Sequence, residues 1–479
     1  MVNIKVLFVA SEAYPFIKTG CVGDMVYELP KALRKLGIDV RVIIPKYSGI
    51  PLLLKNCMET IATFTVKVGW RNKYCGLEYL TYDDVPYYFI DNEYYFKRPE
   101  VYGYYDDGER FSYFSKAILE SIKYMGDFIP DIIQCNNWQC GIIPLLLKDK
   151  YSKDIRFNKI KSIFTIHDLK NQGIFPREIL KELLNLEEDY FNEDALKFHD
   201  SISFMKGGII FSDAVTTVSN PYAREIQDSY YEEGLSGLLS SKAEKLYEII
   251  NGIDYELYNP KLDEKIFCNY DLQSIKQKVK NKLSFQEELC LTVDEDIPMV
   301  GIVTSKVNQK GLDLIIDKLQ ELLSLDIQIV LLGNGEKYYE DIFQFYASRY
   351  PSRISTNIIF DEKTAQRIYA ASDMFLMPSL IEPGGIEELI ALKYGSIPIV
   401  HETGGLKDPV IFYSKYTGNG NCFSFNNYKS EELLDAVNRA LDLYKDKTSW
   451  NNLIRNAMLS NNSWEISAKK YMKLYSNIV

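Results

Sequence analysis

Short apolar runs alternate with helical stretches along this chain, and the alternation starts twice. The first series includes "KVLFVA" from Lys5, "DVRVIIP" from Asp39 and "KSIFTIH" from Lys161. The second series begins at Met299 with "MVGIVTS" and continues through "IQIVLLG" to "IPIVHE". Strands that alternate with helices predict parallel sheets with helices on both faces. The sequence therefore predicts an α/β protein made of two doubly wound, Rossmann-like domains.

The length of the chain agrees with two domains, because 479 residues exceed what one hydrophobic core usually supports. We expect the first domain to cover residues 1–245 and the second to cover 246–458, with the boundary near the lysine-rich "SSKAEKLYE". Two such domains leave a central cleft, where strand ends and helix N-termini can face a shared ligand.

The composition restricts the possible partners. A net charge of −11, with acidic residues scattered along the chain, argues against nucleic acid. Since no run of about 18 apolar residues occurs, we expect no membrane contact. The chain opens on a strand without a cleavable signal pattern, which favours a cytoplasmic location.

A metal site is not expected from the sequence. Eight cysteines are far apart and only three histidines occur, so no cluster has the spacing of zinc ligands. The acidic pairs Asp83-Asp84 and Asp106-Asp107 lie in turn-like sequence, and we expect them to be solvated loop acids.

The stretch "KTGCVGD", between the first apolar run and a helix, has the features of an anion site. Gly20 and Gly23 let backbone approach a ligand closely, a helix N-terminus favours negative charge, and Lys18 adds a positive charge. Glycine-rich turns between strand and helix are also common packing devices. The pattern alone leaves both interpretations open.

Two stretches in the second half have the same strand-to-helix context. In "TSKVNQKGLDLI", Lys306 and Lys310 precede a helix, which suits a diphosphate, although two solvated lysines are the alternative. In "PSLIEPGGIEELIALKYG", Glu382 follows a strand, so its carboxylate can face the cleft or cap a helix. His167 ends the run "KSIFTIH", and a single histidine is more often structural than catalytic.

Together these segments resemble the bacterial glycogen synthase and plant starch synthase family over nearly the whole chain. The opening "KVLFVASEAYPFIKTGCVGDMVYELPKAL" is similar to the start of that family, which usually reads K-T-G-G-L-G-D. The family's other motifs follow in its order, as "YYFKRPEVYG", "ERFSYFSKAILE", "HDLKNQGIFP", "FMKGGIIFSDAVTTVSNPYAREI", "EEGLSGLL", "IINGIDYELYNP", "QKGLDLI", "YAASDMFLMPSLIEPGG", "ALKYGSIPIVHETGGL" and "SWEISAKKYMKLY". A match of so many motifs in one order is specific.

The resemblance implies a fold and a reaction. The fold is the two-Rossmann GT-B glycosyltransferase architecture, whose last segment, here 459–479 with a helix from Trp464 to Ile478, crosses back to the first domain. The reaction is transfer of glucose from ADP-glucose to the 4-hydroxyl at the non-reducing end of an α-1,4-glucan such as glycogen. The family retains the anomeric configuration and uses neither a metal nor a cofactor.

The resemblance also implies which residues bind the donor. Lys18 and the backbone from Gly20 to Gly23 would hold the diphosphate, with Asp24 on the sugar side. Further donor-binding positions are Asn251, Gly384, Gly385 and Phe360, whose ring would stack on the adenine.

Other positions carry over to the chemistry and to the acceptor. His167 would contact the transferred glucose near the reacting carbon, and Lys310, with Lys306 beside it, would neutralise the departing ADP. Glu382 corresponds to the family's essential carboxylate, which would stabilise an oxocarbenium-like state. The acceptor-side positions are Asn137 and Trp138.

Several positions depart from the family's pattern. Lys306 replaces an arginine, which keeps the charge but loses the bidentate fork. The sequence "QCNNWQC" replaces H-x-H-D-W-H, so Asn137 takes the place of an acid and Gln134, Asn136 and Gln139 take the places of histidines. The remaining departures are Cys21 for glycine, Asp168 for asparagine, Leu380 for arginine and Gly384 for cysteine.

Two alternatives to a glycogen or starch synthase are open. One is a degenerate paralogue that binds glucan or a nucleotide sugar as a regulatory partner without turnover. The other is a related retaining glycosyltransferase that uses UDP-glucose, because stacking on an aromatic ring tolerates either base. Activity is favoured by the joint presence of Lys18, His167, Lys310 and Glu382.

Overall fold

The computed structural model describes residues 4–229, 233–304, 309–357, 359 and 361–479. These residues divide into two compact units. Unit 1 comprises Met1–Ile250 together with Trp464–Val479, and unit 2 comprises Asn251–Ser463. The sequence predicts the corresponding limits at 245 and 458, a few residues earlier in each case.

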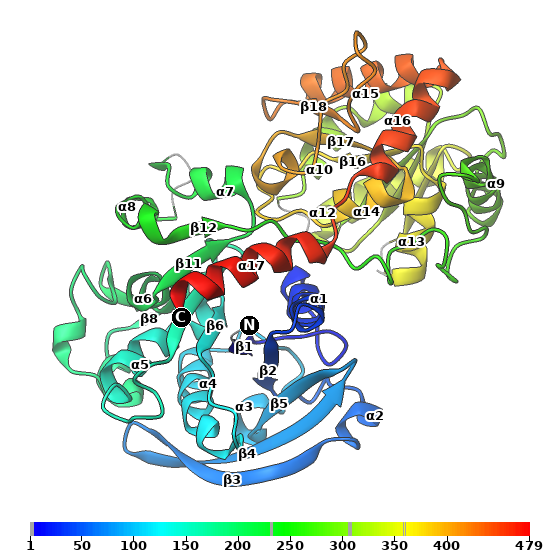
Figure 1. Cartoon of the computed structure of the whole chain (residues 1–479). Helices are drawn as coiled ribbons and strands as arrows, with labels where there is room; N and C mark the ends of the chain where they lie inside the picture. Colours follow the sequence, from blue (N-terminus) through cyan, green and yellow to red (C-terminus); the bar gives the residue numbers. More distant parts are fainter. Residues whose placement is uncertain (1–3, 230–232, 305–308, 358, 360) are drawn as a thin grey trace. The chain divides into compact units, whose positions relative to one another are not determined.

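Unit 1 is built on a nine-stranded sheet in the order β12-β11-β7-β6-β1-β2-β5-β4-β3 (Figure 1). Its strands are β1 (Lys5–Val9), β2 (Asp39–Pro45), β3 (Glu59–Val68), β4 (Arg71–Tyr82), β5 (Val85–Asp91), β6 (Ile132–Asn136), β7 (Lys161–Ile166), β11 (Ala214–Thr217) and β12 (Leu246–Glu248). A small antiparallel sheet contains β8 (Ile174–Pro176), β10 (Ser201–Ser203) and β9 (Lys197–Phe198).

Helices surround the large sheet of unit 1. They are α1 (Cys21–Lys35), α2 (Leu52–Lys55), α3 (Glu93–Phe96), α4 (Asp107–Ser121), α5 (Ile143–Lys150), α6 (Phe204–Phe211), α7 (Asn220–Glu225), α8 (Ser236–Ser241) and α17 (Trp464–Ile478). Their apolar faces and the central strands form one continuous core, because parallel strands covered by helices are buried on both faces.

The prediction of parallel strands is wrong at one edge of unit 1. There β4 pairs antiparallel with both β3 and β5. Two tight turns cause this arrangement: one contains Gly69, with φ of 59°, and the other contains Asp83 and Asp84, with φ of 45° and 61°. Two-residue turns with positive φ connect adjacent antiparallel strands.

The expectation of solvated loop acids is wrong for the second acidic pair. Asp107 is buried, and its Oδ1 lies 2.5 Å from a guanidinium nitrogen of the fully buried Arg110. Asp106 lies 2.5 Å from a guanidinium nitrogen of Arg98. The pair therefore has a structural role at the start of α4.

The C-terminal helix α17 packs within unit 1, next to α1 (Figure 1). The indole N–H of Trp464 donates to the Glu28 carboxylate of α1, and the Tyr475 hydroxyl donates to the Gln134 side chain of β6. Gln134 in turn donates to Thr165 of β7 at 3.2 Å. A glutamine at position 134 thus serves to anchor the last helix to the sheet.

Unit 2 contains a parallel six-stranded sheet in the order β15-β14-β13-β16-β17-β18. Its strands are β13 (Met299–Val303), β14 (Gln328–Leu332), β15 (Ile354–Asn357), β16 (Met374–Met377), β17 (Ile397–His401) and β18 (Phe423–Phe425). The helices are α9 (Lys278–Glu288), α10 (Leu312–Asp317), α11 (Leu319–Ser324), α12 (Lys337–Arg349), α13 (Glu362–Ala371), α14 (Glu387–Tyr394), α15 (Ser430–Tyr444) and α16 (Lys447–Leu459). As predicted, strands and helices alternate here.

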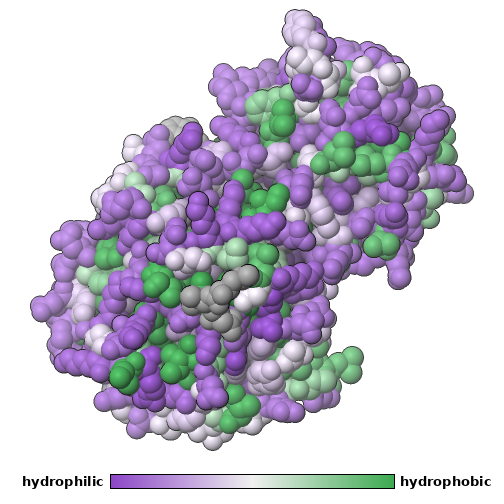
Figure 2. All heavy atoms as spheres, viewed as in Figure 1, coloured by the Kyte–Doolittle hydropathy of each residue, from purple (hydrophilic) through white to green (hydrophobic). Residues whose placement is uncertain are grey.

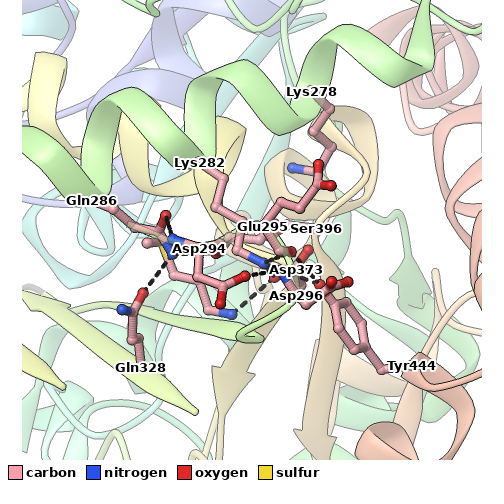
Figure 3. A network of polar contacts seen from close by, with 12 residues as sticks. Lys278, Lys282, Gln286, Asp294, Glu295, Asp296, Gln328, Asp373, Ser396 and Tyr444 are labelled. Carbon is pink, nitrogen blue, oxygen red and sulfur yellow. Dashed lines mark hydrogen bonds and ion pairs between the residues drawn. The ribbon is translucent and has the colours of Figure 1, made fainter. Parts of the chain in front are cut away.

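A buried polar network joins α9 to the sheet of unit 2 (Figure 3). The Lys282 ammonium lies 2.7 Å from Asp373 and donates to the Glu295 carbonyl and the Tyr444 hydroxyl. One turn earlier, Lys278 donates to the carbonyls of Tyr369 and Ala370 at the end of α13. Buried lysines are tolerated here because each ammonium has several acceptors.

The view of the surface in Figure 2 shows mostly hydrophilic residues with scattered apolar ones. Among the described residues, no helix is both long enough and apolar enough to span a bilayer.

Candidate functional site

In unit 1 the predicted site residues follow three neighbouring strands. Lys18 follows β1, Asn137 follows β6 and His167 follows β7, and these strands are adjacent in the order β7-β6-β1. Because the strands are parallel, their carboxyl ends meet at one edge of the sheet. Ligands bind at this edge in open α/β sheets.

The segment from Lys18 to Asp24, here called the lysine turn, leads from β1 into α1. The Lys18 ammonium lies 2.7 Å from the Asp24 carboxylate. Gly20 precedes the first residue of α1 with extended backbone and adds no side chain in front of the helix. A side chain at Gly23 would have its Cβ only 3.1 Å from Lys18 Cγ, so glycine leaves room for the stem of the lysine.

A buried glutamate that the sequence analysis did not single out holds the lysine turn in place. Glu12 accepts hydrogen bonds on Oε2 from the Thr19 backbone N–H at 2.5 Å and from its hydroxyl at 2.7 Å. Burial raises the pKa of Glu12, and the bonds from Thr19 oppose that rise. A sequence signal existed, since an acid shortly after a buried strand needs a partner where it is buried too.

His167 is buried and held by two asparagines. Its backbone N–H donates to Asn137 Oδ1 at 3.0 Å, and its Nε2 lies 3.0 Å from Asn136 Oδ1. The Asn136 amide nitrogen donates to the Val9 carbonyl at 2.9 Å, which identifies Oδ1 as the atom that faces the ring. Because Oδ1 only accepts, His167 carries its proton on Nε2.

The other ring nitrogen of His167 is consequently an unprotonated acceptor. Nδ1 is buried and has no hydrogen-bond partner in the part of the chain that the structure describes. Burial lowers the pKa of His167 to about 3, so the ring is neutral at physiological pH. A neutral imidazole can accept a hydrogen bond from a hydroxyl group.

The two asparagines explain part of the departure from the H-x-H-D-W-H pattern. Asn136 and Asn137 both serve to position His167, and Asn137 adopts a positive φ of 57°. Trp138 packs against Phe111 and Phe175, and a side chain at Gly173 would collide with its indole ring. The tryptophan is nearly fully buried and therefore supports the wall of this region.

In unit 2 the predicted residues also gather at the carboxyl ends of two adjacent strands. Lys310 follows β13 and Glu382 follows β16, and these strands pair directly. The Lys310 ammonium lies 2.6 Å from Glu382 Oε2. The structure therefore brings together two residues that are 72 positions apart in the sequence.

The segment from Ser379 to Gly385, here called the glutamate loop, is fixed by side chains and backbone. The Ser379 hydroxyl donates to Glu382 Oε2 at 3.1 Å, and His401 Nδ1 lies 2.7 Å from the Ser379 carbonyl. The Gly405 N–H donates to the Glu382 carbonyl at 2.7 Å. Burial raises the pKa of Glu382, and the Lys310 ammonium opposes that rise.

Glycine is required beside this ion pair. Gly311, which caps α10, has φ of 72°, and a Cβ there would lie 2.0 Å from the Pro378 carbonyl oxygen. Glycine allows the turn that carries Lys310 to lie directly on the strand end that precedes Glu382. A small cavity of about 20 Å³, lined by Thr304, Gly333 and Thr356 among others, lies at the neighbouring strand ends and has room for about one water.

The second residue that the sequence analysis missed is Glu388, in the first turn of α14. Its side chain is fully buried, and among the described residues neither carboxyl oxygen has a hydrogen-bond partner in another residue. Its position in the sequence could have identified it as buried. Glu388, Ala391 and Leu392 have the i, i+3, i+4 spacing of a buried helix face. A glutamate on such a face is unusual.

The remaining predicted residues are placed as follows. Asn251 is buried at the start of unit 2, and Gly384 and Gly385 belong to the glutamate loop. Lys306 and Phe360 lie outside the described residues. Within the described ranges, no group of three or more histidine, cysteine or acidic side chains has an arrangement that could hold a metal ion.

Comparison with known proteins identifies the family. A model of the starch synthase catalytic domain matches residues 5–241, and a model of group 1 glycosyl transferases matches residues 291–457. The glycogen synthase of Clostridium acetobutylicum is 56% identical over 99% of this chain and 100% of its own length. That of Caldicellulosiruptor bescii is 53% identical with the same coverage.

The chain belongs to the glycogen and starch synthase family. A solved structure supports this assignment: the catalytic domain of starch synthase IV from Arabidopsis thaliana, bound to ADP and acarbose, matches with a TM-score of 0.93 and 32% identity over 99% of both chains. Sucrose-phosphate synthase from Thermosynechococcus elongatus, at 16% identity and a TM-score of 0.64, shares the fold. The protein therefore has the GT-B glycosyltransferase fold of this family.

The geometry within each unit suits the chemistry of a glycosyltransferase. The lysine turn offers an ammonium and a helix N-terminus to an anion. His167 offers a neutral acceptor nitrogen to a hydroxyl group. The glutamate loop offers the Glu382 carboxylate in contact with the Lys310 ammonium, and the two can stabilise opposite charges that develop on one substrate.

Proposed function

We propose that this member of the glycogen and starch synthase family transfers glucose from ADP-glucose to the 4-hydroxyl at the non-reducing end of an α-1,4-glucan, with retention of configuration. The bond between the anomeric carbon and the diphosphate oxygen breaks, and a bond to the acceptor oxygen forms on the same face of the sugar. The proton of the acceptor hydroxyl goes to the departing phosphate oxygen. ADP and a glucan longer by one glucose are the products.

The observation that carries this proposal is the contact between Lys310 and Glu382 at the carboxyl ends of β13 and β16. The reaction creates negative charge on the leaving oxygen and positive charge on the sugar ring. An ammonium and a carboxylate 2.6 Å apart can each stabilise one of these charges. A protein that only binds a glucan would not need this pair in a buried position.

The proposed role of Lys310 is to neutralise the diphosphate, with Lys18 of the lysine turn and the N-terminus of α1 as further positive groups. An incoming diphosphate would compete with Glu382 for the Lys310 ammonium. Release of Lys310 would leave Glu382 held by Ser379 and free to face the sugar.

His167 is proposed to bind the transferred glucose. Its Nδ1 is an acceptor without a partner, and a sugar hydroxyl is a donor of the right kind. Because the ring is neutral, it adds no charge that would oppose an oxocarbenium-like state. Asn136 and Asn137 would fix the ring in the required tautomer.

The test is a transfer assay with purified protein, a glycogen primer and either ADP-glucose or UDP-glucose, in which release of the nucleoside diphosphate is measured. We expect release with ADP-glucose, a slower rate with UDP-glucose and a rate at least about 10²–10³-fold lower with Glu382→Gln. Faster release with UDP-glucose would change the proposed donor. No release with either donor, together with retained glycogen binding, would favour a regulatory binding protein instead.

A further inference from the structure

Glu388 is a carboxyl group in an unusual position. Its side chain is fully buried in unit 2, and neither of its oxygens has a hydrogen-bond partner in another described residue. An ionised carboxylate without a partner in such a place costs many kcal/mol, whereas a protonated one costs much less. The folded protein therefore favours the neutral form of Glu388.

The carboxyl of Glu388 lies directly against the glutamate loop. A Cβ built on Gly385 would lie 2.1 Å and 2.4 Å from its two oxygens, so the carboxyl occupies the space that a side chain at 385 would need. The backbone of Gly385 also has a positive φ, which favours glycine. Gly385 and Glu388 are thus matched to each other, three residues after Glu382.

The charges around Glu388 explain why the neutral form is retained. Burial has the largest effect on its pKa, and the carboxylates of Glu382 and Glu387 raise that pKa further. Lys310 opposes them with a smaller effect. Tyr369 also lies near this group, and burial raises the pKa of its hydroxyl. Ionisation of Glu388 would place a second negative charge beside Glu382.

We propose that Glu388 is a positioning residue for the transfer reaction: its neutral carboxyl, packed against Gly385, holds the glutamate loop in the shape that presents Glu382 and keeps a second negative charge away from the diphosphate. The inference rests on the proposed function of Glu382. It predicts that donor binding and turnover decline at alkaline pH, when Glu388 ionises and the loop must rearrange.

The decisive variant is Glu388→Gln, which has nearly the same shape but cannot ionise. For wild type and variant, the ratio of turnover at alkaline pH to turnover at neutral pH is measured, together with the affinity for ADP at both pH values. We expect the ratio of turnover at alkaline pH to turnover at neutral pH to be at least about threefold higher in Glu388→Gln than in the wild type. The same increase is expected for the ratio of the two ADP affinities. The matched control is Glu287→Gln, an exposed glutamate on α9, which should have wild-type ratios.

A second variant tests the contact rather than the charge. Gly385→Ala places a methyl group where the carboxyl lies, so it should lower turnover more than it lowers ADP affinity even at neutral pH. A third readout is independent of catalysis: infrared spectroscopy of the wild type at neutral pH should show a protonated carboxyl band that is absent from Glu388→Gln.

The outcomes separate this inference from the proposed function. Equal pH ratios in wild type and Glu388→Gln, or the absence of a carboxyl band that the variant removes, would overturn the role of Glu388. If the wild type turns over no sugar nucleotide, the proposed function fails. In that case the pH dependence of ADP affinity and the infrared band still decide whether a neutral Glu388 holds the loop.

Discussion

The lysine turn of unit 1 and the glutamate loop of unit 2 each pair a lysine with a carboxylate after a parallel strand, but in different surroundings. The side chains of Lys18 and Asp24 are 36% and 16% exposed, whereas those of Lys310 and Glu382 are 18% and 10% exposed. Water screens the first pair more than the second. The two ion pairs therefore differ in the strength of their attraction, although their distances of 2.7 and 2.6 Å are similar.

The distance between two charges therefore does not by itself rank ion pairs by their energetic importance. Removal of one partner from a buried pair leaves an uncompensated charge, which is costly, while an exposed partner is compensated by water and salt. We therefore expect changes in the glutamate loop to have larger effects than equivalent changes in the lysine turn. The following predictions test this expectation, from the largest effect to the smallest.

The largest effect is expected for Glu382→Gln. The variant should lower turnover by about 10²–10³-fold or more, because it removes the charge that stabilises a cationic sugar. ADP affinity should change little or improve, since the change frees Lys310 for the diphosphate. Initial rates and calorimetric ADP affinity measure the two effects. Equal losses in both would show that Glu382 is structural.

The next largest effects are expected for substitution of the two lysines, Lys310 and Lys18. Lys310→Ala should cost about 2–4 kcal/mol of transition-state stabilisation, measured as a lower kcat/KM, as loss of one preorganised donor typically does. Lys18→Ala should cost less, and its effect should shrink as salt is added, because the more exposed ammonium is screened. Rates at low and high ionic strength distinguish the two variants. A larger and salt-independent loss for Lys18→Ala would reverse our ranking of the two pairs.

A smaller effect per pH unit is expected from the pH dependence of unit 1. The pKa of His167 is about 3 in the folded state against an ordinary 6.5, so between these values the unfolded chain holds one more proton. The free energy of unfolding should therefore fall as pH falls from 6.5 to 3, by up to about 1.4 kcal/mol per pH unit.

Hydrogen exchange of the β7 amides at several pH values would measure this slope. In His167→Gln the slope should decrease, while amides in the unit 2 sheet should keep the wild-type behaviour. An unchanged slope at β7 would mean that other groups cause the acid sensitivity.

The smallest effect is expected for Tyr475→Phe in α17. The variant removes the hydrogen bond to Gln134 and leaves that buried side chain with one partner fewer. A loss of about 1 kcal/mol in the stability of unit 1 should follow. Denaturant unfolding measures it, with Tyr416→Phe, an exposed tyrosine of unit 2, as the control. A loss no greater than in the control would show that the Tyr475 hydroxyl does not help to anchor α17.

The sequence by itself determined the class of fold and the family. Alternating apolar and helical segments predict parallel sheets because the periods of strand and helix are set by local geometry. The lysine turn and the glutamate loop were also recognisable, since glycines and charged residues between a strand and a helix form a local pattern. The edge formed by β3, β4 and β5 was misjudged, because the turns that reverse those strands are two residues long.

Only the tertiary structure decided which side chains meet. The contact between Lys310 and Glu382 depends on the pairing of β13 with β16, and the tautomer of His167 depends on a hydrogen bond between Asn136 and the Val9 carbonyl. Likewise, a substitution such as Gln134 for histidine gained a role in anchoring α17. Strand order and burial join residues that are far apart in the chain, and the raised pKa values of Glu12 and Glu388 and the lowered pKa of His167 follow from the solvent that this packing removes.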